Sequence, residues 1–344
     1  MKKPYIVLYI IIYILCAALF MGCAVLLTGC AAPGRAQDTT LFAMDTVMNL
    51  RIYGDDGSAA KELSELIAGL DAALGATDAH SALYALNETG RSDDPTVCQM
   101  LALALAFCEQ THGAVDPTVY PLVRLWGFPT GEYRVPSAQE IAAALECTGT
   151  DKLRLEDGAV TLADGAALDF GAFAKGWAGE LCRDALLARG LSGILTLGGN
   201  IQTVGAKPDG SDWAVGVADP DDPAGYVLTL RLKGSCAVVT SGDYQRYFED
   251  GGVRYCHILD PQTGRPAESG LRSVTVVCES GARADALSTA LFVMGLDQAA
   301  EFWRQTGDFE AVFIDEGGTI YVTEGLADAA SGEFSVLPKE AAPT

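Results

Sequence analysis

The strand and helix patterns of this chain are interspersed without regular alternation, and this order most limits the folds available to it. Short apolar runs predict strands at 40–54, 194–200, 213–220, 226–232, 236–242, 254–261, 272–280 and 310–325, and a hairpin at 152–170 that turns at Asp157-Gly158. Helical spacing predicts helices at 59–74, 97–112, 137–147, 172–189 and 282–294. A doubly wound parallel sheet needs strict alternation of strands and helices. We therefore expect an α+β fold, a single mixed domain of interspersed antiparallel strands and helices.

The first 40 residues have the features of an export signal followed by a tether. Two lysines precede an unbroken apolar run from 5 to 27, which leads through Leu-Thr-Gly to Cys30. Small residues after such a run are typical of a secretory signal, and a cysteine at this point looks like a bacterial lipobox. We expect a signal peptide at 1–29, a lipidated Cys30 and a tether at 30–40. The alternative is an uncleaved membrane anchor, because 23 apolar residues could span a bilayer.

Both alternatives place the rest of the chain, a domain expected at 41–330 and a tail at 331–344, outside the cytoplasm. About half of the residues are apolar, which is typical of a globular protein, and the net charge is −22. A surface this acidic repels phosphate backbones, so we expect no nucleic-acid partner.

The cysteines do not form a recognisable framework. Seven of the ten lie beyond residue 30, at wide and irregular spacing, and no CxxC pair is present. We therefore expect neither a disulfide scaffold nor a zinc site, and most of these cysteines should be small buried apolar residues. Cys256 lies next to His257, but adjacent residues of a strand point to opposite faces, which argues against Cys256 as a nucleophile.

Three segments could carry chemistry that involves a cation or an anion. In "ARADALSTALFVMG", Asp285 and Thr289 lie four residues apart and share one face of a helix, a pairing that suits Mg²⁺; helix capping by Asp285 is the alternative. In "LDFGAFAKGWAGE", Lys175 lies near the start of a helix and could hold an anion, or it could be a surface lysine. The two glycines of "ILTLGGN" would let a ligand approach closely, although many turns look the same.

The segment "HILDPQTG" contains one of the three histidines of the chain, His257, next to a turn that Asp260-Pro261 and Gly264 enforce. A histidine held at the end of a strand can accept a proton from a hydroxyl near neutral pH. A purely structural histidine is the alternative.

Nine segments taken in order carry a resemblance to a known family. They are "FAMDTVMNL", "SALYALN", "GAVDPTVYPLVRLWGF", "LDFGAFAKGWAGE", "LGGNIQTVG", "WAVGVADP", "TSGDYQRY", "HILDPQTGRP" and "ADALSTALFVMG". This series resembles the ApbE family of FAD:protein FMN transferases over about residues 40–325. The resemblance implies a T-fold-like, ApbE-type catalytic domain that is extracytoplasmic, often lipid-anchored and Mg²⁺-dependent.

The resemblance also implies an activity and a set of site residues. Members cleave FAD, attach FMN to a threonine hydroxyl in a Ser-Gly-Ala-Thr-like motif of an acceptor protein, such as an electron-transfer protein, and release AMP. The metal ligands would be the main-chain oxygen of Ala172 with Asp285 and Thr289, and His257 would be the base. Ser288 stands where some members have an acidic ligand, which leaves a second metal site open. The implied FAD contacts are Met44, Ala114, Val115, Asp116, Asp169, Lys175, Gly198, Gly199, Asn200 and Ile258.

Two other activities use the same motifs. The chain could carry FAD as an electron-transfer lipoprotein, although flavin redox chemistry needs no Mg²⁺ and thus no Asp285/Thr289 pair. It could also be an FAD pyrophosphatase in which water replaces the threonine. A solute-binding lipoprotein is more distant, because it needs neither the metal pair nor His257.

Overall fold

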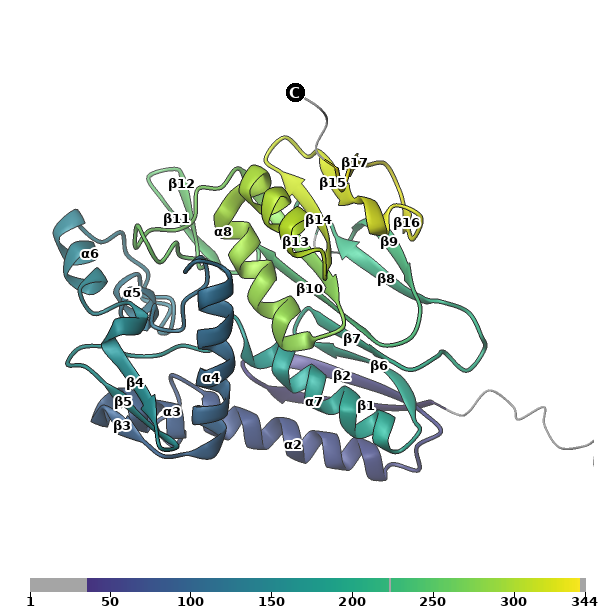
Figure 1. The fold of residues 1–344 in the computed structure, drawn as a ribbon, viewed down its shortest axis with the longest axis horizontal. Coiled ribbons are helices and arrows are strands. Elements are labelled where there is room, and N and C mark those ends of the chain that lie inside the picture. The colour runs from purple at the N-terminus through teal and green to yellow at the C-terminus, as the bar shows by residue number, and fades with distance from the viewer. Residues whose placement is uncertain (1–35, 223, 341–344) are drawn as a thin grey trace, which may run out of the picture.

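A nine-stranded sheet organises the molecule, a computed structural model that describes residues 36–222 and 224–340 (Figure 1). Its strands lie in the order β1-β2-β6-β7-β10-β13-β14-β15-β17, and each neighbouring pair is antiparallel except β15 and β17. The bounds are β1 (Ala36–Ala43), β2 (Thr46–Tyr53), β6 (Ser192–Leu197), β7 (Asn200–Val204), β10 (Cys236–Gly242), β13 (Leu271–Cys278), β14 (Glu310–Asp315), β15 (Ile320–Thr323) and β17 (Ser335–Leu337).

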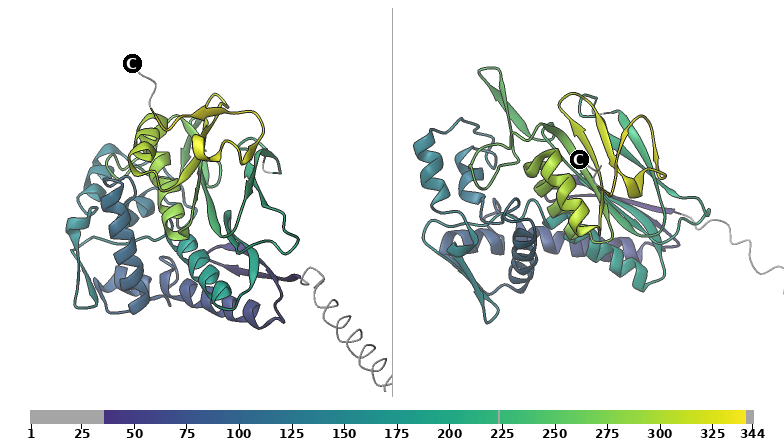
Figure 2. Two further views of the ribbon diagram at one scale, coloured as in Figure 1. Left: turned by 45° about the vertical axis from the view of Figure 1, so that its right-hand side comes forward. Right: turned by 45° about the horizontal axis from the view of Figure 1, so that its top comes forward.

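Three smaller sheets surround the main one. They consist of β16 (Ala330–Ser331), β9 (Tyr226–Leu232) and β8 (Trp213–Ala218); of β3 (Arg91–Ser92), β5 (Ala159–Leu162) and β4 (Leu153–Glu156); and of β11 (Tyr247–Asp250) and β12 (Val253–Cys256). The β11–β12 hairpin projects from the body of the molecule (Figure 2, right).

Helices cover one face of the main sheet, and the β8–β9 hairpin packs on the other (Figure 1). These are α2 (Ser58–Leu74), α7 (Ala174–Ala188) and α8 (Gly281–Thr306). Of the other helices, α3 (Ala82–Thr89) and α4 (Pro95–Gln110) pack against α2, and α5 (Tyr120–Leu125) packs against α6 (Ala138–Leu145). Because both faces are covered, the central strand β13 is buried along almost its whole length: Val274 and Val276 face α8, while Val277 faces the hairpin side. This arrangement confirms the α+β prediction.

Several predicted elements agree with the structure because their signals are local. The Asp157-Gly158 turn joins β4 to β5. Ser137 and Glu140 form the reciprocal capping box that starts α6. The predicted helix at 97–112 begins two residues earlier, because the Asp94 side chain accepts from the amides of Thr96 and Val97.

Other predictions were wrong for reasons that pattern alone does not reveal. The single strand expected at 40–54 is the β1–β2 hairpin, because Met44 and Asp45 adopt positive φ angles of 49° and 58°. The helix expected to stop at Gly295 kinks there, with φ 76° and ψ 170°, and continues to Thr306. The strand expected at 254–261 ends at Cys256. Helices α3 and α5 were not predicted.

The ends of the sheet extend past the expected domain boundaries. β1 begins at Ala36, inside the expected tether, and β17 lies inside the expected tail at 331–344. The expected signal peptide at 1–29 and Cys30 fall outside the described residues. Within the part of the chain that the structure describes, no helix combines the length and the apolar character needed to cross a bilayer.

Helices α7 and α8 cross at two glycines. A Cβ atom on Gly176 would overlap the carbonyl oxygen of Gly281, and a Cβ atom on Gly281 would overlap that of Gly176. Only hydrogen fits between two backbones this close, so the crossing fixes how the start of α7 meets the start of α8.

We expect Gly176→Ala to lower the free energy of unfolding by about 1–3 kcal/mol, because the added methyl group forces the two helices apart. Gly69→Ala is the matched control. Gly69 lies within α2, and an added Cβ would have open space around it. The control should therefore be neutral or more stable by ~0.5–1 kcal/mol. Urea denaturation followed by circular dichroism measures both, and equal midpoints for the two variants would show that the crossing is not tight.

Candidate functional site

Two turns lie side by side at one end of the main sheet. The β1–β2 turn holds Met44, whose amide donates to Asp71 Oδ1 at 2.9 Å. The β6–β7 turn consists of Gly198 and Gly199, with φ angles of 60° and 97°. A Cβ atom on Gly198 would overlap the side chain of Thr46, so glycine is required where the turns meet. The strained backbone at Met44 therefore lies beside the glycine turn expected to admit a ligand.

The loop before α7 brings Asp169 and Lys175 together. Asp169 Oδ1 accepts from the amide of Gly171 at 2.6 Å, and Lys175 Nζ donates to the carbonyl of Gly171 at 3.4 Å. Burial raises the pKa of Asp169, while the Gly171 amide and the charges of Lys175 and Arg246 oppose that rise. The half-buried ammonium group of Lys175 is thus positioned near the start of a helix, where an anion would be stabilised.

The 114–118 loop is bonded through its backbone to the loop that precedes α7. The amide of Asp169 donates to the carbonyl of Pro117 at 2.8 Å. Asp116 Oδ1 accepts from the amide and the hydroxyl of Thr118, so this oxygen is committed to the turn. Ala114 and Val115 are buried at 9% and 3% exposure, which leaves mainly backbone atoms of this loop for contact with a ligand.

A small cavity lies between the start of α7 and β7. Its volume is about 10 Å³, and Lys175, Gly179, Asn200 and Gln202 are among its lining residues. Asn200 Nδ2 and Gln202 Oε1 are both buried and have no hydrogen-bond partner among the described residues. Asn200, which was predicted to contact FAD, is only 5% exposed. Its side chain lines this interior cavity together with Gln202.

The proposed metal ligands lie on or just before the two helices that cross: Asp285 and Thr289 on α8, and Ala172 two residues before α7. The amide of Gly176 would close a helical turn onto the carbonyl of Ala172, but it donates instead to Asp285 Oδ2 at 2.7 Å. Within residues 36–222 and 224–340, Asp285 Oδ1 and the Ala172 carbonyl oxygen accept no protein hydrogen bond. Two oxygens without donors, one of them a carboxylate, suit a hard cation such as Mg²⁺. The residues present thus fit the metal that the resemblance implies.

A cluster of hydroxyl groups lies beside Asp285. Ser241 Oγ is 2.8 Å from Ser288 Oγ and 3.2 Å from Thr289 Oγ1, and Ser288 Oγ donates to the carbonyl of Asp285 at 2.9 Å. Thr289 is half-buried and remains available as an oxygen ligand, while Ser288 is fully buried and bonded within the protein. The sequence contains no signal for Ser241, because the contact joins β10 to α8.

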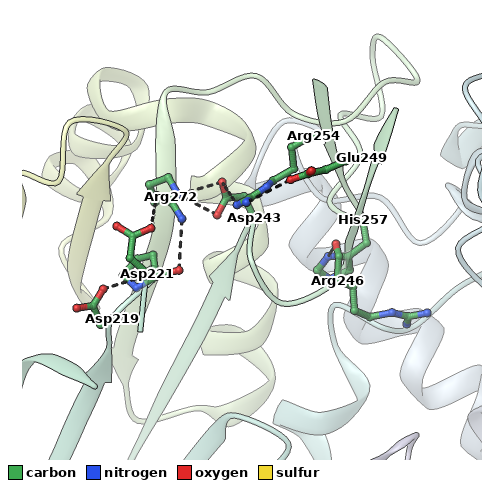
Figure 3. Close-up of polar contacts among 9 residues, drawn as sticks. Asp219, Asp221, Asp243, Arg246, Glu249, Arg254, His257 and Arg272 are labelled. Atoms are coloured by element: carbon green, nitrogen blue, oxygen red, sulfur yellow. Dashed lines mark hydrogen bonds and ion pairs between the residues drawn. The ribbon is translucent and has the colours of Figure 1, made fainter. Parts of the chain in front are cut away.

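His257 follows β12 directly and is held by the chain before β11 (Figure 3). The carbonyl of Arg246 accepts from the backbone amide of His257 at 3.0 Å and lies 3.2 Å from its Nδ1. Because a carbonyl oxygen can only accept, this contact assigns the ring proton to Nδ1 and leaves Nε2 as an acceptor. Burial, followed by the charges of Arg246 and Lys175, lowers the pKa of His257 to about 4. The half-buried ring is therefore neutral at pH 7.

The Asp-Pro-x-Thr-Gly turn after His257 is as stiff as its composition predicts. Asp260 Oδ1 accepts from the amide of Gln262, and the Asp260 carbonyl accepts from that of Gly264, each at 2.8 Å. Trp126 Nε1 donates to the carbonyl of Gly264 at 2.9 Å and so ties the turn to the end of α5. The backbone therefore turns away after His257, while the histidine ring stays directed toward the Arg246 carbonyl.

Two residues near His257 have structural positions. Ile258 is 5% exposed and belongs to the apolar cluster under α8, so its side chain packs in the core. Burial raises the pKa of the Cys256 thiol to about 11, which keeps this cysteine protonated and unreactive at neutral pH. The seven cysteines within the described residues are all free.

Comparison with known proteins confirms the predicted family. The ApbE family model matches residues 44–313. The FAD:protein FMN transferase of Treponema pallidum is 33% identical over 313 residues, which cover 82% of this chain and 85% of that protein. The Escherichia coli K12 protein of the same name is 31% identical over 313 residues, covering 86% and 89%.

Solved structures agree. The crystal structure of the ApbE protein from Thermotoga maritima is 34% identical with a TM-score of 0.80, over 86% of this chain and 99% of that one. The apo flavinyl transferase ApbE of Pseudomonas stutzeri is 32% identical with a TM-score of 0.77, over 86% and 97%. The chain described here is therefore a member of the ApbE family.

Proposed function

We propose that this protein transfers FMN from FAD to a threonine hydroxyl of an acceptor protein and releases AMP. The observation that carries the proposal is the hydrogen bond between His257 Nδ1 and the Arg246 carbonyl. It leaves a neutral imidazole with Nε2 ready to accept a proton, close enough to Lys175 for that charge to lower the pKa of the ring. A base beside a group that binds phosphate is what transfer from FAD to a hydroxyl requires.

The proposed reaction forms one bond to phosphorus and breaks another, with one proton transferred to His257. The threonine oxygen attacks the phosphorus of the FMN half of the pyrophosphate, and His257 Nε2 takes the hydroxyl proton. The bond from that phosphorus to the bridging oxygen breaks, and AMP departs with this oxygen. Lys175 neutralises part of the charge on the pyrophosphate, so that the incoming hydroxyl meets less repulsion.

Ala172, Asp285 and Thr289 would hold magnesium through a carbonyl, a carboxylate and a hydroxyl oxygen. When bound, the ion would neutralise charge on the phosphate oxygens and favour departure of AMP. Asp285 also accepts the amide proton of Gly176 at 2.7 Å, so the carboxylate is already oriented by α7. This preorganisation supports Asp285 as the principal ligand.

The same proposal places FAD along the edge formed by the two sheet turns and the start of α7. Its proposed contacts are Met44, Gly198, Gly199, the 114–116 loop and Asp169. The acceptor would carry a Ser-Gly-Ala-Thr-like segment, and we propose that it lies outside the cytoplasm. The supports for this location are the signal peptide expected at 1–29 and the expected lipid anchor at Cys30.

We expect kcat/KM for FAD to be constant from about pH 6 to 8 and to fall only toward pH 4. The base acts in its neutral form, and the lowered pKa of about 4 keeps His257 neutral above that pH in the free enzyme. The ratio kcat/KM reports the free enzyme, whereas kcat reports the complex, in which the anionic pyrophosphate should raise the pKa of His257. A value of kcat/KM already halved at pH 6.5, the ordinary pKa of histidine, would show that the protein does not lower the pKa of His257.

The intact mass of an acceptor tests the proposed activity. The protein is mixed with FAD, MgCl₂ and an acceptor that carries a Ser-Gly-Ala-Thr segment, with a threonine-to-alanine acceptor as the control. A mass gain of one FMN on the first acceptor alone, together with free AMP, is the expected result. FAD bound without reaction would instead support a flavin carrier. FMN and AMP released into solution would support a pyrophosphatase.

A further inference from the structure

Arg272 and Asp243 form a two-way contact outside the candidate site (Figure 3). Arg272 Nε lies 3.1 Å from both carboxylate oxygens of Asp243, while the amide of Asp243 donates to the carbonyl of Arg272 at 3.0 Å. The two side chains are only 18% and 20% exposed, so solvent screens their interaction weakly. Asp243 directly follows β10, and Arg272 lies at the start of β13.

Arg272 also reaches the loop between β8 and β9. Its Nη1 contacts Asp221 Oδ1 at 3.0 Å, and its Nη2 donates to the carbonyl of Pro220 at 3.3 Å (Figure 3). A guanidinium group has five donors in a fixed planar arrangement, so one side chain can join three segments rigidly. Arg254 of β12 approaches the same Asp243 carboxylate at 3.8 Å.

Asp243 begins a short loop that ends at Arg246, the residue whose carbonyl holds His257. Gln245 Nε2 donates to the carbonyl of Thr240 at 3.0 Å, and Arg246 Nη2 donates to that of Phe128 at 2.8 Å. The next group along is the Arg246 carbonyl, which accepts from both the backbone and the ring of His257. The position of this carbonyl thus depends on how the 243–246 segment is anchored at each end.

We propose that the Arg272–Asp243 pair is a positioning device that holds the Arg246 carbonyl in place and so keeps the His257 ring as the Nδ1–H tautomer with Nε2 available. Neither residue touches the reacting atoms. The effect on catalysis rests on the proposed function, whereas the effect on the histidine ring does not.

Nitrogen NMR of the imidazole rings tests the ring effect directly. Since the chain has only three histidines, ¹⁵N-histidine labelling and a His257→Gln sample assign the His257 signals. In the wild-type protein we expect separate shifts for a protonated Nδ1 and an unprotonated Nε2. In Arg272→Met we expect the shifts to move toward the averaged values of a mixture of tautomers. Unchanged His257 shifts in Arg272→Met would overturn the proposal.

Two further variants keep the test interpretable. Arg272→Lys retains the charge but not the planar set of donors. The His257 nitrogen shifts in this variant should therefore lie between those of the wild type and those of Arg272→Met. If Arg272→Met does not fold, Arg272→Lys takes its place in the test. Arg189→Met is the matched control: Arg189 is also ion-paired, to Glu62 at 3.0 Å, but it lies at the end of α7. It should leave the His257 shifts unchanged. If the His257 shifts moved in both Arg272→Met and Arg189→Met, the cause would be a general loss of rigidity in the fold, and the proposal would also be overturned.

Kinetics separate positioning from structural support. For Arg272→Met we expect kcat for transfer to fall about tenfold while KM for FAD stays within about twofold, since misplacing a base slows chemistry more than binding. In a His257→Ala background, Arg272→Met should change the rate less than about twofold, because the effect acts through His257. An equal loss in both backgrounds would overturn the proposal. If the wild-type protein transferred no FMN, the proposed function would fail, while the NMR result would still decide whether the pair positions the ring.

Discussion

Replacing His257 with glutamine should lower the rate of FMN transfer by about 10²- to 10⁴-fold, the usual contribution of a general base. Glutamine is chosen because its amide can still donate to the Arg246 carbonyl, which now lies 3.2 Å from Nδ1, but it cannot accept a proton at neutral pH. FAD binding should change little, since the proposed phosphate contacts come from other residues. The substitution should therefore slow the chemistry while keeping the local fold.

Single-turnover transfer with saturating FAD, followed by the intact mass of the acceptor, measures this effect. His80→Gln is the control, because His80 is exposed on the surface between α2 and α3. The control should transfer at the wild-type rate. Transfer by His257→Gln within about twofold of wild type would show that the threonine hydroxyl loses its proton elsewhere.

Asp285→Asn should lower transfer at least about 100-fold, with a loss that added MgCl₂ only partly restores. Asparagine has nearly the same shape, and its carbonyl oxygen can still accept the Gly176 amide that Asp285 Oδ2 accepts at 2.7 Å. The second carboxylate oxygen, however, becomes an NH₂ group that repels a cation. Chelation of the wild-type enzyme with EDTA should abolish transfer in the same way, and excess MgCl₂ should restore it.

The matched control is Asp297→Asn, which removes an exposed charge from the same helix, α8. The structure excludes the capping role that the sequence left open for Asp285, because Ser280 caps α8 and Asp285 lies beyond its first turn. If Asp285 served only to accept the Gly176 amide, Asp285→Asn would lower the melting temperature and leave the magnesium dependence of the rate unchanged. A steeper or shifted magnesium dependence in Asp285→Asn alone would support the metal role.

Features with local chemistry could be predicted from the sequence. Asp157-Gly158 gives a tight hairpin because glycine tolerates positive φ, and Ser137 with Glu140 starts a helix because the two side chains cap each other's backbone. The Asp-Pro-x-Thr-Gly turn after His257 follows in the same way from its residues. Nine segments in a fixed order were sufficient to identify the family, although no single segment would have been.

The missed elements depend on contacts that no window of sequence contains. The turn at Met44 and Asp45 uses positive φ angles without glycine. It is held by the Asp71 side chain, which accepts from the Met44 amide, and by the Gly198 turn, which contacts Thr46. The kink at Gly295 looks like a helix end in sequence, but the chain resumes a helix because its later apolar residues pack on the same cluster.

The sequence by itself determined the fold class, the family and the identities of the candidate residues, because these follow from local preference and from motifs in order. Only the tertiary structure decided how those residues are held. Asp285 is oriented by an amide 109 positions away, and His257 is held by a carbonyl 11 positions away, at Arg246. The second contact is made by a backbone atom that every residue possesses. Its role depends on where the chain is anchored, and only the folded molecule specifies that.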